Sequence, residues 1–437
     1  MKSFFESKKI AVIGAARERE KVGNAVFRNL LEQEKAGLRI FPVNPNADYV
    51  EGRKAYPSVL GIPYPVDMAV IAVPAVIVPT VLEECRKKDI KNVIIISAGF
   101  SEAGNIKLSE KVKEIAEKYK IKLIGPNVLG IVNPYKNMNA SFFSEMPEKG
   151  QVAFISQSGA LGTSILDKCL EEKLGISGFV SLGNMLQQDF IDSLDYFGND
   201  VHTGVICIYV ESLKENTGKD FVDLCKKISS KKFIIALKSG KSKEGKEASK
   251  THTASIASDA KIYSGVFKQA NVIEVDSLEE MFLLARVLSK YGKLGKKACI
   301  ITNAGGLGIL ATDSLVEAGF EIEKIPEAVL IELDKFMPDM YSRRNPLDIL
   351  GDALAERYDK ALHILEMYKI ADFYVVIVSP QEMTQPLETA RVLTKYNKAI
   401  ACFIGGKSFL EAKRFMKEEG IISLNDVIEL EIFGKAS

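Results

Sequence analysis

Short apolar runs alternate with longer amphipathic stretches along almost the whole chain. The runs are only a few residues long and nearly free of polar positions, which is typical of parallel strands buried on both faces of a sheet. The stretches between them carry apolar residues at helical spacing, so they predict the helices that connect such strands. The predicted strands are 10–13, 40–43, 68–73, 93–96, 122–124, 152–155, 178–180, 205–210, 233–237, 272–275, 298–301, 320–322, 373–378 and 399–404.

The strands form three series, and each new series starts after a polar segment. The first such segment, residues 133–149, holds two prolines and several polar residues, and the second, residues 291–297, is basic and contains glycine. A length of 437 residues suits three domains of roughly 100–200 residues each. We therefore predict an α/β protein of three doubly wound domains, over residues 1–132, 148–290 and 297–437.

Composition is that of an ordinary globular protein, with 47% hydrophobic residues and a net charge of +1. No basic arm or acidic tail is visible, so we expect neither a nucleic-acid partner nor a membrane surface. No apolar run reaches the roughly 18–20 residues of a membrane span, and the N-terminal residues lack the apolar core of a signal peptide. The six cysteines are scattered without a CxxC pair. We therefore expect a reduced, cytoplasmic setting without a disulfide framework or a metal site.

The turn after the first strand lies where a dinucleotide-binding fold carries its glycine fingerprint. Gly14 is in place, but Ala16 and Arg19 stand where the second and third glycines belong. The second strand ends in Asn44 and Pro45 and offers no carboxylate for a ribose hydroxyl, which disfavours NAD. Four residues of the longer turn suit the phosphates of another nucleotide: Arg17, Arg19, Lys21 and Gly23. The alternative is that the three cations are ordinary loop charges.

Three further strands of the first series also end in small residues and prolines. Ligands of open α/β sheets bind outside the carboxyl ends of the strands, where such residues leave the backbone accessible. These strand ends hold Val73 and Pro74, Ser97 to Gly99, and Gly125 to Asn127.

Two strand–turn–helix segments place hydroxyl and amide donors at a helix start. A helix N-terminus favours a nearby anion by about 0.3–1 kcal/mol, so two termini converging on one phosphoryl group could hold it without Lys or Arg. The donors of the first segment are Ser156, Ser158 and Gly159, and those of the second are Asn303, Ala304, Gly305 and Gly306.

His252, one of three histidines, follows a predicted strand and a charged loop and precedes a helix expected from about Asp259. An imidazole outside the core is suited to take up a group at one place and release it at another, although an exposed loop histidine is the alternative. Glu211 ends the predicted strand 205–210. Its carboxylate could accept one ring N–H of His252 and leave the other nitrogen free to attack phosphorus, whereas the alternative is a Glu that starts a helix.

Several other features are interpreted as structural. Residues 240–242 resemble the end of a P-loop, but Ile235 stands where the upstream glycine belongs. His202 lies in a polar loop and His363 on an amphipathic helix, so neither is expected to carry chemistry.

Five motifs, at residues 156–159, 209–211, 250–253, 302–306 and 345–348, together resemble the alpha subunit of the ADP-forming (NDP-forming) acetyl-CoA synthetases, relatives of succinyl-CoA synthetase. The resemblance covers essentially the whole chain. It implies a Rossmann-like CoA-binding domain followed by two flavodoxin-like ligase domains. The implied reaction is acyl-CoA + ADP + phosphate ⇌ carboxylic acid + CoA + ATP, with His252 as a transient phosphohistidine, Glu211 orienting it, and the two helix starts cradling the phosphoryl group.

The resemblance also implies ligands and partners. No segment of the sequence resembles an ATP-grasp nucleotide site. The resemblance therefore implies that Mg-ADP and Mg-ATP bind to a separate beta subunit, and that the two subunits form a heterotetramer. A ligase for succinate or another dicarboxylate and a non-catalytic CoA-sensing relative remain as alternatives, whereas the first turn opposes an NAD-linked oxidoreductase. The implied CoA contacts are Gly14, Ala15, Ala16, Lys21, Gly23, Asn44, Pro45, Val73, Pro74, Ser97, Ala98, Gly99, Pro126 and Asn127.

Overall fold

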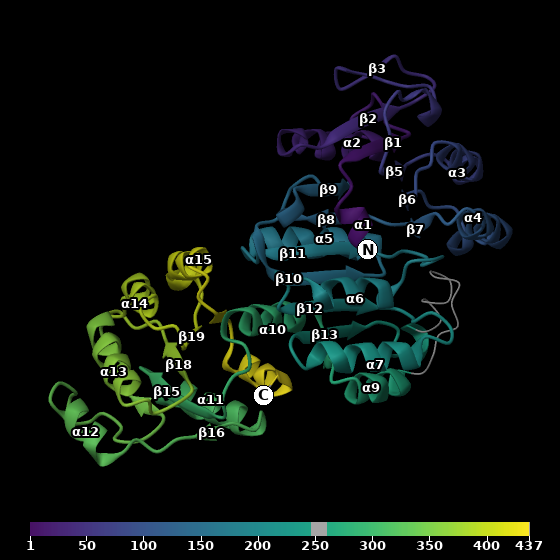
Figure 1. Ribbon diagram of the computed structural model, residues 1–437. Helices are drawn as coiled ribbons and strands as arrows, with labels where there is room; N and C mark the ends of the chain where they lie inside the picture. Colours follow the sequence, from purple (N-terminus) through teal and green to yellow (C-terminus); the bar gives the residue numbers. More distant parts are fainter. Residues whose placement is uncertain (246–259, 437) are drawn as a thin grey trace. The chain divides into compact units, whose positions relative to one another are not determined.

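The computed structural model describes residues 1–245 and 260–436 and shows two compact units, Met1–Met281 and Phe282–Ser437 (Figure 1). The first unit contains a five-stranded sheet, a seven-stranded sheet and a small hairpin. The second unit contains one six-stranded sheet. The predicted α/β fold is therefore present in both units.

The first sheet confirms all five strands predicted for it. Its order is β2-β1-β5-β6-β7, and every pairing is parallel. Ile10 and Val12 face one apolar core while Ala11 and Ile13 face another, because successive side chains of a strand point to opposite faces. The strands are β1 (Lys9–Ile13), β2 (Arg39–Val43), β5 (Met68–Ile71), β6 (Asn92–Ile95) and β7 (Lys122–Ile124).

The connections of the first sheet are mostly helical, as expected for a doubly wound fold. The α-helices are α2 (Val22–Glu32), α3 (Val78–Lys87) and α4 (Ile106–Lys118). The 3₁₀ helices are η1 (Glu34–Ala36), η2 (Val59–Gly61), η3 (Ala75–Ile77) and η4 (Ser101–Ala103), and the hairpin is β3 (Tyr49–Val50) with β4 (Arg53–Lys54).

The second sheet contains the five predicted strands and two that the pattern did not predict. The parallel strands are β10 (Lys149–Ser156), β11 (Ile176–Ser181), β12 (Val205–Val210), β13 (Phe233–Lys238) and β14 (Ile273–Val275). Antiparallel strands β8 (Gly130–Asn133) and β9 (Met138–Ser141) extend the sheet beyond β11. The polar segment 133–149 therefore includes a strand, because Asn139 and Ser141 are buried and hydrogen-bonded to each other.

Helices also surround the second sheet (Figure 1). They are α5 (Gly159–Glu171), α6 (Phe190–Asn199), α7 (Gly218–Ser229) and α9 (Ala260–Gln269), with the 3₁₀ helix η5 (Pro134–Lys136) between β8 and β9. The next helix, α10 (Leu278–Tyr291), instead contributes Leu283 and Val287 to the core of the second unit. The short helix α1 (Lys2–Phe5) buries Phe4 and Phe5, and the Phe5 ring stacks on Tyr196 of α6 at 4.9 Å. One apolar cluster runs from Phe27 of α2 to Ile155 of β10. The two sheets of the first unit thus share a core.

The sheet of the second unit has the parallel order β16-β15-β18-β19-β20, and β17 also pairs with β15. The strands are β15 (Lys297–Thr302), β16 (Glu321–Ile322), β17 (Leu347–Asp348), β18 (Phe373–Val378), β19 (Ala399–Phe403) and β20 (Ser423–Leu424). The helices are α11 (Gly305–Glu317), α12 (Glu327–Asp334), α13 (Ala355–Met367), α14 (Pro386–Leu393), α15 (Leu410–Glu418), η6 (Lys407–Phe409) and η7 (Val427–Ala436). Strands β17 and β20 were not predicted, since two residues are too short for a recognisable pattern.

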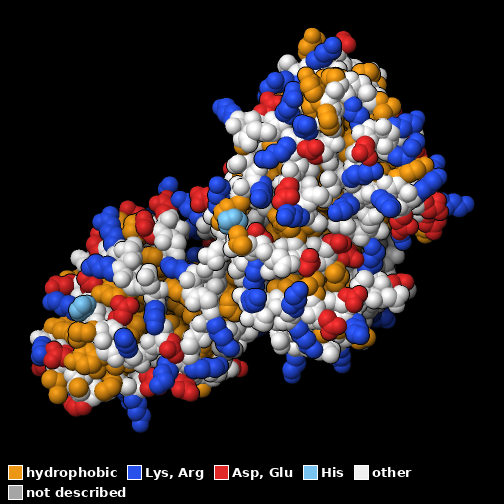
Figure 2. Space-filling model, in the orientation of Figure 1, with side chains coloured by type: hydrophobic (Ala, Val, Ile, Leu, Met, Phe, Trp, Pro, Cys, Tyr) orange, Lys and Arg blue, Asp and Glu red, His pale blue; other side chains and the backbone are white. Residues whose placement is uncertain are grey.

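Cationic and anionic side chains are interspersed over the face shown in Figure 2. Within the described parts of the chain, no helix has both the length and the apolar character that a bilayer crossing requires.

Candidate functional site

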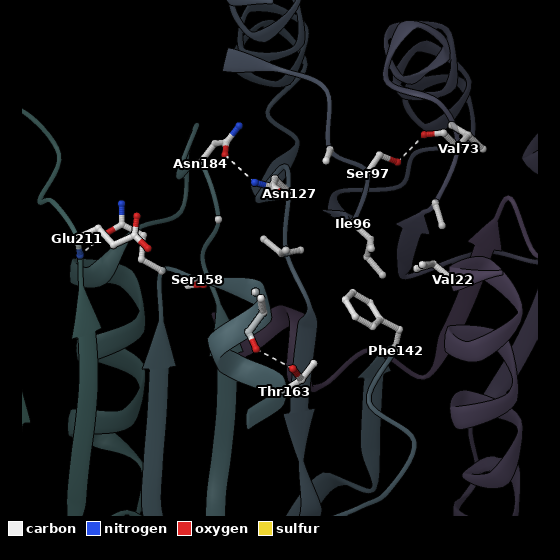
Figure 3. Close-up of a pocket in the computed structure, with 17 residues that line it drawn as sticks. Val22, Val73, Ile96, Ser97, Asn127, Phe142, Ser158, Thr163, Asn184 and Glu211 are labelled. Atoms are coloured by element: carbon white, nitrogen blue, oxygen red, sulfur yellow. Dashed lines mark hydrogen bonds between the residues drawn. The ribbon is translucent and has the colours of Figure 1, made fainter. Parts of the chain in front are cut away.

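A pocket of about 690 Å³ lies in the first unit, where strands of both sheets end (Figure 3). The turns after β5, β6 and β7 form one side of it, and the turns after β10, β11 and β12 form the other. Both sheets therefore direct their carboxyl edges, the usual ligand-binding edges, toward one cavity. Seven of the predicted site residues line it: Val73, Ser97, Ala98, Asn127, Ser158, Gly159 and Glu211.

The other site residues predicted within the described first unit do not line this pocket: some lie in or next to the same turns, and the rest lie in or near the turns after β1 and β2. They are Gly14, Ala15, Ala16, Lys21, Gly23, Asn44, Pro45, Pro74, Gly99, Pro126 and Ser156. Ten lining residues were not predicted: Val22, Ala72, Ile96, Val128, Phe142, Gln157, Ala160, Thr163, Gly183 and Asn184.

Gly14 allows the end of β1 to lie close to the end of β5, and Gly23 allows α2 to pack closely on β1. Gly14 has φ +93°, and a Cβ there would lie 2.3 Å from the carbonyl oxygen of Ala72. A Cβ on Gly23 would lie 2.0 Å from the carbonyl oxygen of Gly14. Close helix–strand packing is the task of the third glycine in a dinucleotide fingerprint. In this chain Gly23 permits that close packing, although the turn before it is longer than in the fingerprint. Asn44 stabilises the turn, because its Nδ2 donates to the carbonyl of Ala15 at 2.8 Å.

The turn after β10 presents Ser158 and Gly159 at the start of α5. Ser158 is the N-cap, and its Oγ accepts the N–H of Leu161 at 3.3 Å. Ser156 is fully buried and donates its hydroxyl to the carbonyl of Ser158 at 2.8 Å. Ser156 therefore braces the turn from inside, whereas Ser158 and Gly159 face the pocket.

Gln157 connects this turn to the one that carries Glu211. Its Oε1 accepts the N–H groups of Glu211 at 2.9 Å and Ser212 at 3.0 Å, and its Nε2 donates to Ser212 Oγ at 3.2 Å. Glu211 is only 8% exposed, and in Figure 3 it lies beside Ser158 and across the pocket from Phe142. Burial raises the pKa of the nearby Tyr209 hydroxyl, and the Glu211 carboxylate raises it further.

Phe142 belongs to the segment after β9 and forms the opposite wall with Val22 and Ile96 (Figure 3). Asn29 of α2 holds this segment, because its Nδ2 donates to the carbonyls of Ser141 at 2.8 Å and Phe143 at 2.7 Å. The apolar wall is thus fixed by a buried amide of the first sheet's own helix.

Charge is sparse in the pocket. Among the described residues that line it, Glu211 is the only charged one, and none is Lys, Arg or His. The polar groups that remain are hydroxyls, amides and the N-terminus of α5, which favour an anion without a formal cation. The described part of the chain holds no group of three or more His, Cys, Asp and Glu side chains that could bind a metal ion.

The second unit repeats the bridging amide in its own turn. Asn303 is buried, accepts the N–H of Ser379 at 2.8 Å and donates to its carbonyl at 3.1 Å. Ala304 donates its N–H to Thr302 Oγ1 at 3.0 Å. Asn303 and Ala304 thus hold the turn, while Gly305 and Gly306 are exposed at the start of α11.

A carboxylate also lies beside the start of α11. A Cβ on Gly305 would lie 2.8 Å from Oδ2 of Asp348, whose other oxygen accepts the N–H of Leu350 at 3.0 Å. An anion that approached this helix start would therefore meet Asp348.

His252 lies outside the described residues, but the chain on both sides of its segment is described. Before it, Ser239 N–H donates to the carbonyl of Val210 at 3.1 Å. After it, the hydroxyl of Tyr263 in α9 accepts the N–H of Leu213 at 2.8 Å. Both flanks are therefore anchored within two residues of Glu211.

Two of the features interpreted as structural have structural partners, the P-loop-like segment and His202. Lys241 of the P-loop-like segment pairs with Glu274 at 3.0 Å and Asp276 at 2.6 Å. The His202 ring stacks on Tyr135 with 3.8 Å between ring centroids.

Three family models match the chain: the CoA binding domain over residues 8–134, the succinyl-CoA ligase like flavodoxin domain over residues 149–288, and the ligase-CoA domain over residues 298–405. They confirm the predicted fold class, a Rossmann-like CoA-binding part followed by flavodoxin-like ligase parts.

Named relatives agree with these matches. Acetate–CoA ligase (ADP-forming) II subunit alpha of Pyrococcus furiosus is 38% identical over 96% of this chain and 93% of that protein. Acetate–CoA ligase (ADP-forming) I of Archaeoglobus fulgidus is 40% identical over 98% of this chain, which spans 62% of that longer protein. A structure of Ca. Korarchaeum cryptofilum dinucleotide forming acetyl-coenzyme A synthetase 1, in complex with phosphate and ADP, has a TM-score of 0.94 and 34% identity over 100% of this chain and 95% of that one. This chain therefore belongs to the family of ADP-forming acetate–CoA ligases, which are built from succinyl-CoA ligase-like domains.

Proposed function

We propose that this chain is the CoA-binding, phosphohistidine-carrying subunit of an ADP-forming acyl-CoA synthetase, with acetyl-CoA as the simplest substrate. The reaction is acyl-CoA + ADP + phosphate ⇌ carboxylic acid + CoA + ATP. One observation carries the proposal: described residues on both sides of the His252 segment, Ser239 and Tyr263, are hydrogen-bonded within two residues of Glu211, which lines the pocket. The Glu211 carboxylate is therefore the acidic group that we propose as the partner of His252.

The chemistry proceeds in three displacements. Phosphate attacks the thioester carbonyl, the C–S bond breaks, and CoA leaves as a thiolate that takes a proton. An imidazole nitrogen of His252 then attacks phosphorus of the acyl phosphate, and the carboxylate leaves. A β-phosphate oxygen of ADP finally breaks the N–P bond, which yields ATP and restores the imidazole. Glu211 accepts the other ring N–H and stabilises the positive charge of the phosphorylated ring.

The pocket has features suited to these ligands. Its volume of about 690 Å³ accommodates an acyl-pantetheine arm between Val73, Ser97 and the apolar wall at Phe142. The start of α5 at Ser158 and Gly159 offers donors to a phosphoryl oxygen near Glu211. A dicarboxylate such as succinate would bring a second charge that no Lys, Arg or His among the described lining residues could neutralise. We therefore favour an uncharged acyl group.

A complete turnover requires a partner. We propose that an ATP-grasp beta subunit binds Mg-ADP and Mg-ATP and joins this chain in a heterotetramer in the cytoplasm. Two relatives support this division: the Pyrococcus protein is named a subunit alpha, and the Archaeoglobus protein is a longer chain of which this one spans 62%.

Labelled phosphate tests the proposal on the chain alone. Incubation with acetyl-CoA and ³²P-phosphate should give protein label that is stable in alkali and lost in acid, and a His252→Asn variant should carry none. His202→Asn is the matched control and should keep the label, because His202 stacks on Tyr135 and does not line the pocket. Label that persists in His252→Asn, or wild-type protein without label, contradicts the proposal.

A further inference from the structure

The segment after β11 leaves its own sheet and runs along the edge of the first sheet. Asn184 N–H donates to the carbonyl of Pro126 at 3.0 Å, and Leu186 N–H donates to the carbonyl of Gly125 at 3.1 Å. Gly183 has φ +55°, and a Cβ there would lie 2.2 Å from the carbonyl oxygen of Pro126. Only glycine permits this approach. The two sheets of the first unit are thus joined main chain to main chain at the rim of the pocket.

The side chain of Asn184 connects three of the turns that form this rim. Its Nδ2 donates to Glu102 Oε2 at 2.5 Å and lies 3.3 Å from Ser101 Oγ. Its Oδ1 receives a longer contact from Asn127 Nδ2 at 3.5 Å, which Figure 3 shows across the top of the pocket. Asn184 and Asn127 both line the pocket, whereas Glu102 does not.

Glu102 also stabilises, through two hydrogen bonds, the turn after β6 that places Ser97 and Ala98 at the pocket. Its Oε1 accepts the N–H groups of Gly99 at 2.6 Å and Phe100 at 3.2 Å. Burial acts to raise the pKa of Glu102, but the hydrogen bonds from Asn184, Gly99 and Phe100 outweigh it, so the pKa lies below its ordinary value of 4.5. These partners are all neutral, and among the described residues no ion pair to Glu102 is present.

We propose that Asn184 and Glu102 are a positioning pair that sets the affinity of the pocket for CoA. The inference rests on the CoA binding proposed above. Asn184 comes from the second sheet and Glu102 from the first, so their hydrogen bond fixes the distance between the two walls. Without it, Glu102 has one carboxylate oxygen without its donor, and the turn of Ser97 and Ala98 can move away from Asn127.

An exchange of amide and carboxylate gives a sharp test. Asn184→Asp sets two carboxylates against each other without changing shape, and Glu102→Gln sets two amides against each other. The double variant Asn184→Asp/Glu102→Gln restores one donor facing one acceptor. Asn199→Asp is the matched control, since Asn199 Nδ2 also donates to a carboxylate, Asp195 Oδ1 at 3.0 Å, but lies outside the pocket.

The measurement is calorimetric titration of the full chain with coenzyme A at pH 8 and pH 5.5, with thermal unfolding of each variant as a check on folding. At pH 8, Asn184→Asp should bind at least about tenfold more weakly than wild type, because a charge-assisted hydrogen bond becomes a repulsion. At pH 5.5 the pair should share a proton, and the deficit relative to wild type should shrink to about threefold. Glu102→Gln should be weakened at both pH values, and the double variant should recover most of the affinity at pH 8.

Each outcome has a distinct meaning. Asn184→Asp with wild-type affinity at pH 8, or a double variant no better than its parents, overturns the positioning pair. If Asn184→Asp fails to fold at pH 8, Glu102→Gln decides, and wild-type affinity in that variant overturns the inference. Wild-type chain that does not bind coenzyme A at all overturns the proposed function instead.

Discussion

The side-chain oxygen of Gln157 lies 2.9 Å from the main-chain nitrogen of Glu211, so one turn of the pocket fixes the backbone of the other. Asn303 makes the corresponding bond to Ser379 in the second unit at 2.8 Å. In both sheets the amide follows one parallel strand, β10 or β15, and the turn whose N–H group donates to it follows the neighbouring parallel strand, β12 or β18. This is the switch point where open α/β sheets bind ligands. Each turn is therefore ordered before any ligand arrives.

Gln157→Leu should lower both stability and phosphotransfer. The variant keeps the size of the side chain but leaves the buried N–H groups of Glu211 and Ser212 without their acceptor, at a cost of about 1–3 kcal/mol. We expect a lower urea midpoint and slower appearance of ³²P on His252. Gln269→Leu, on the exposed face of α9, is the control and should change neither quantity. A wild-type labelling rate in Gln157→Leu would refute this role.

Glu211→Gln should separate chemistry from binding. The amide keeps the shape of the side chain but cannot stabilise a positively charged imidazole, so phosphorylation of His252 should fall by about two orders of magnitude or more. Affinity for coenzyme A should stay within about twofold, because the start of α5 and the apolar wall are unchanged. Labelling and calorimetry on the same preparation check this, and equal losses in both would instead indicate a damaged pocket.

Gly14→Ala should destabilise the chain by more than a positive φ alone explains. A left-handed conformation costs a non-glycine residue about 1–2 kcal/mol. At Gly14 the new Cβ would in addition lie 2.3 Å from the carbonyl oxygen of Ala72, so the turn after β1 or the turn after β5 must shift. Gly37→Ala is the matched control, since Gly37 has φ +90° and nothing lies within 4 Å of its Cβ position. Urea unfolding should show a clearly larger loss for Gly14→Ala, and similar losses would argue against close packing.

The cysteines should be inert in the folded protein. All six are buried, and burial raises the pKa of Cys85, Cys225 and Cys299 to about 12, so almost no thiolate is present near neutral pH. Ellman's reagent should therefore find less than about one reactive thiol per chain at pH 8 and all six in guanidinium. Fast reaction of several thiols in the native state would contradict the burial.

The apolar runs were long enough to predict most of the parallel strands, whereas the antiparallel strands β8 and β9 were not predicted. Burial of Asn139 and Ser141 depends on their bond to each other and on Asn29, which lies far away in the sequence. Sequence motifs identified Ser158 and Glu211 at the pocket. Applying the strand-end rule to β11 as well would have found Asn184, since it lies three residues after that strand. Phe142 carried no signal, because its place in the wall results from tertiary contacts of a segment that resembled a linker.

The pairing of β8 with β11 also affects the order of assembly. During translation β8 and β9 emerge before the strand that they need, because β10, α5 and β11 follow them in the sequence. A nascent chain that ends just after β9 and Phe142 therefore exposes the edge of β8 that later pairs with β11. The pocket is complete only when the turns after β11 and β12 have been made, so we expect half-made chains not to bind the proposed ligand CoA.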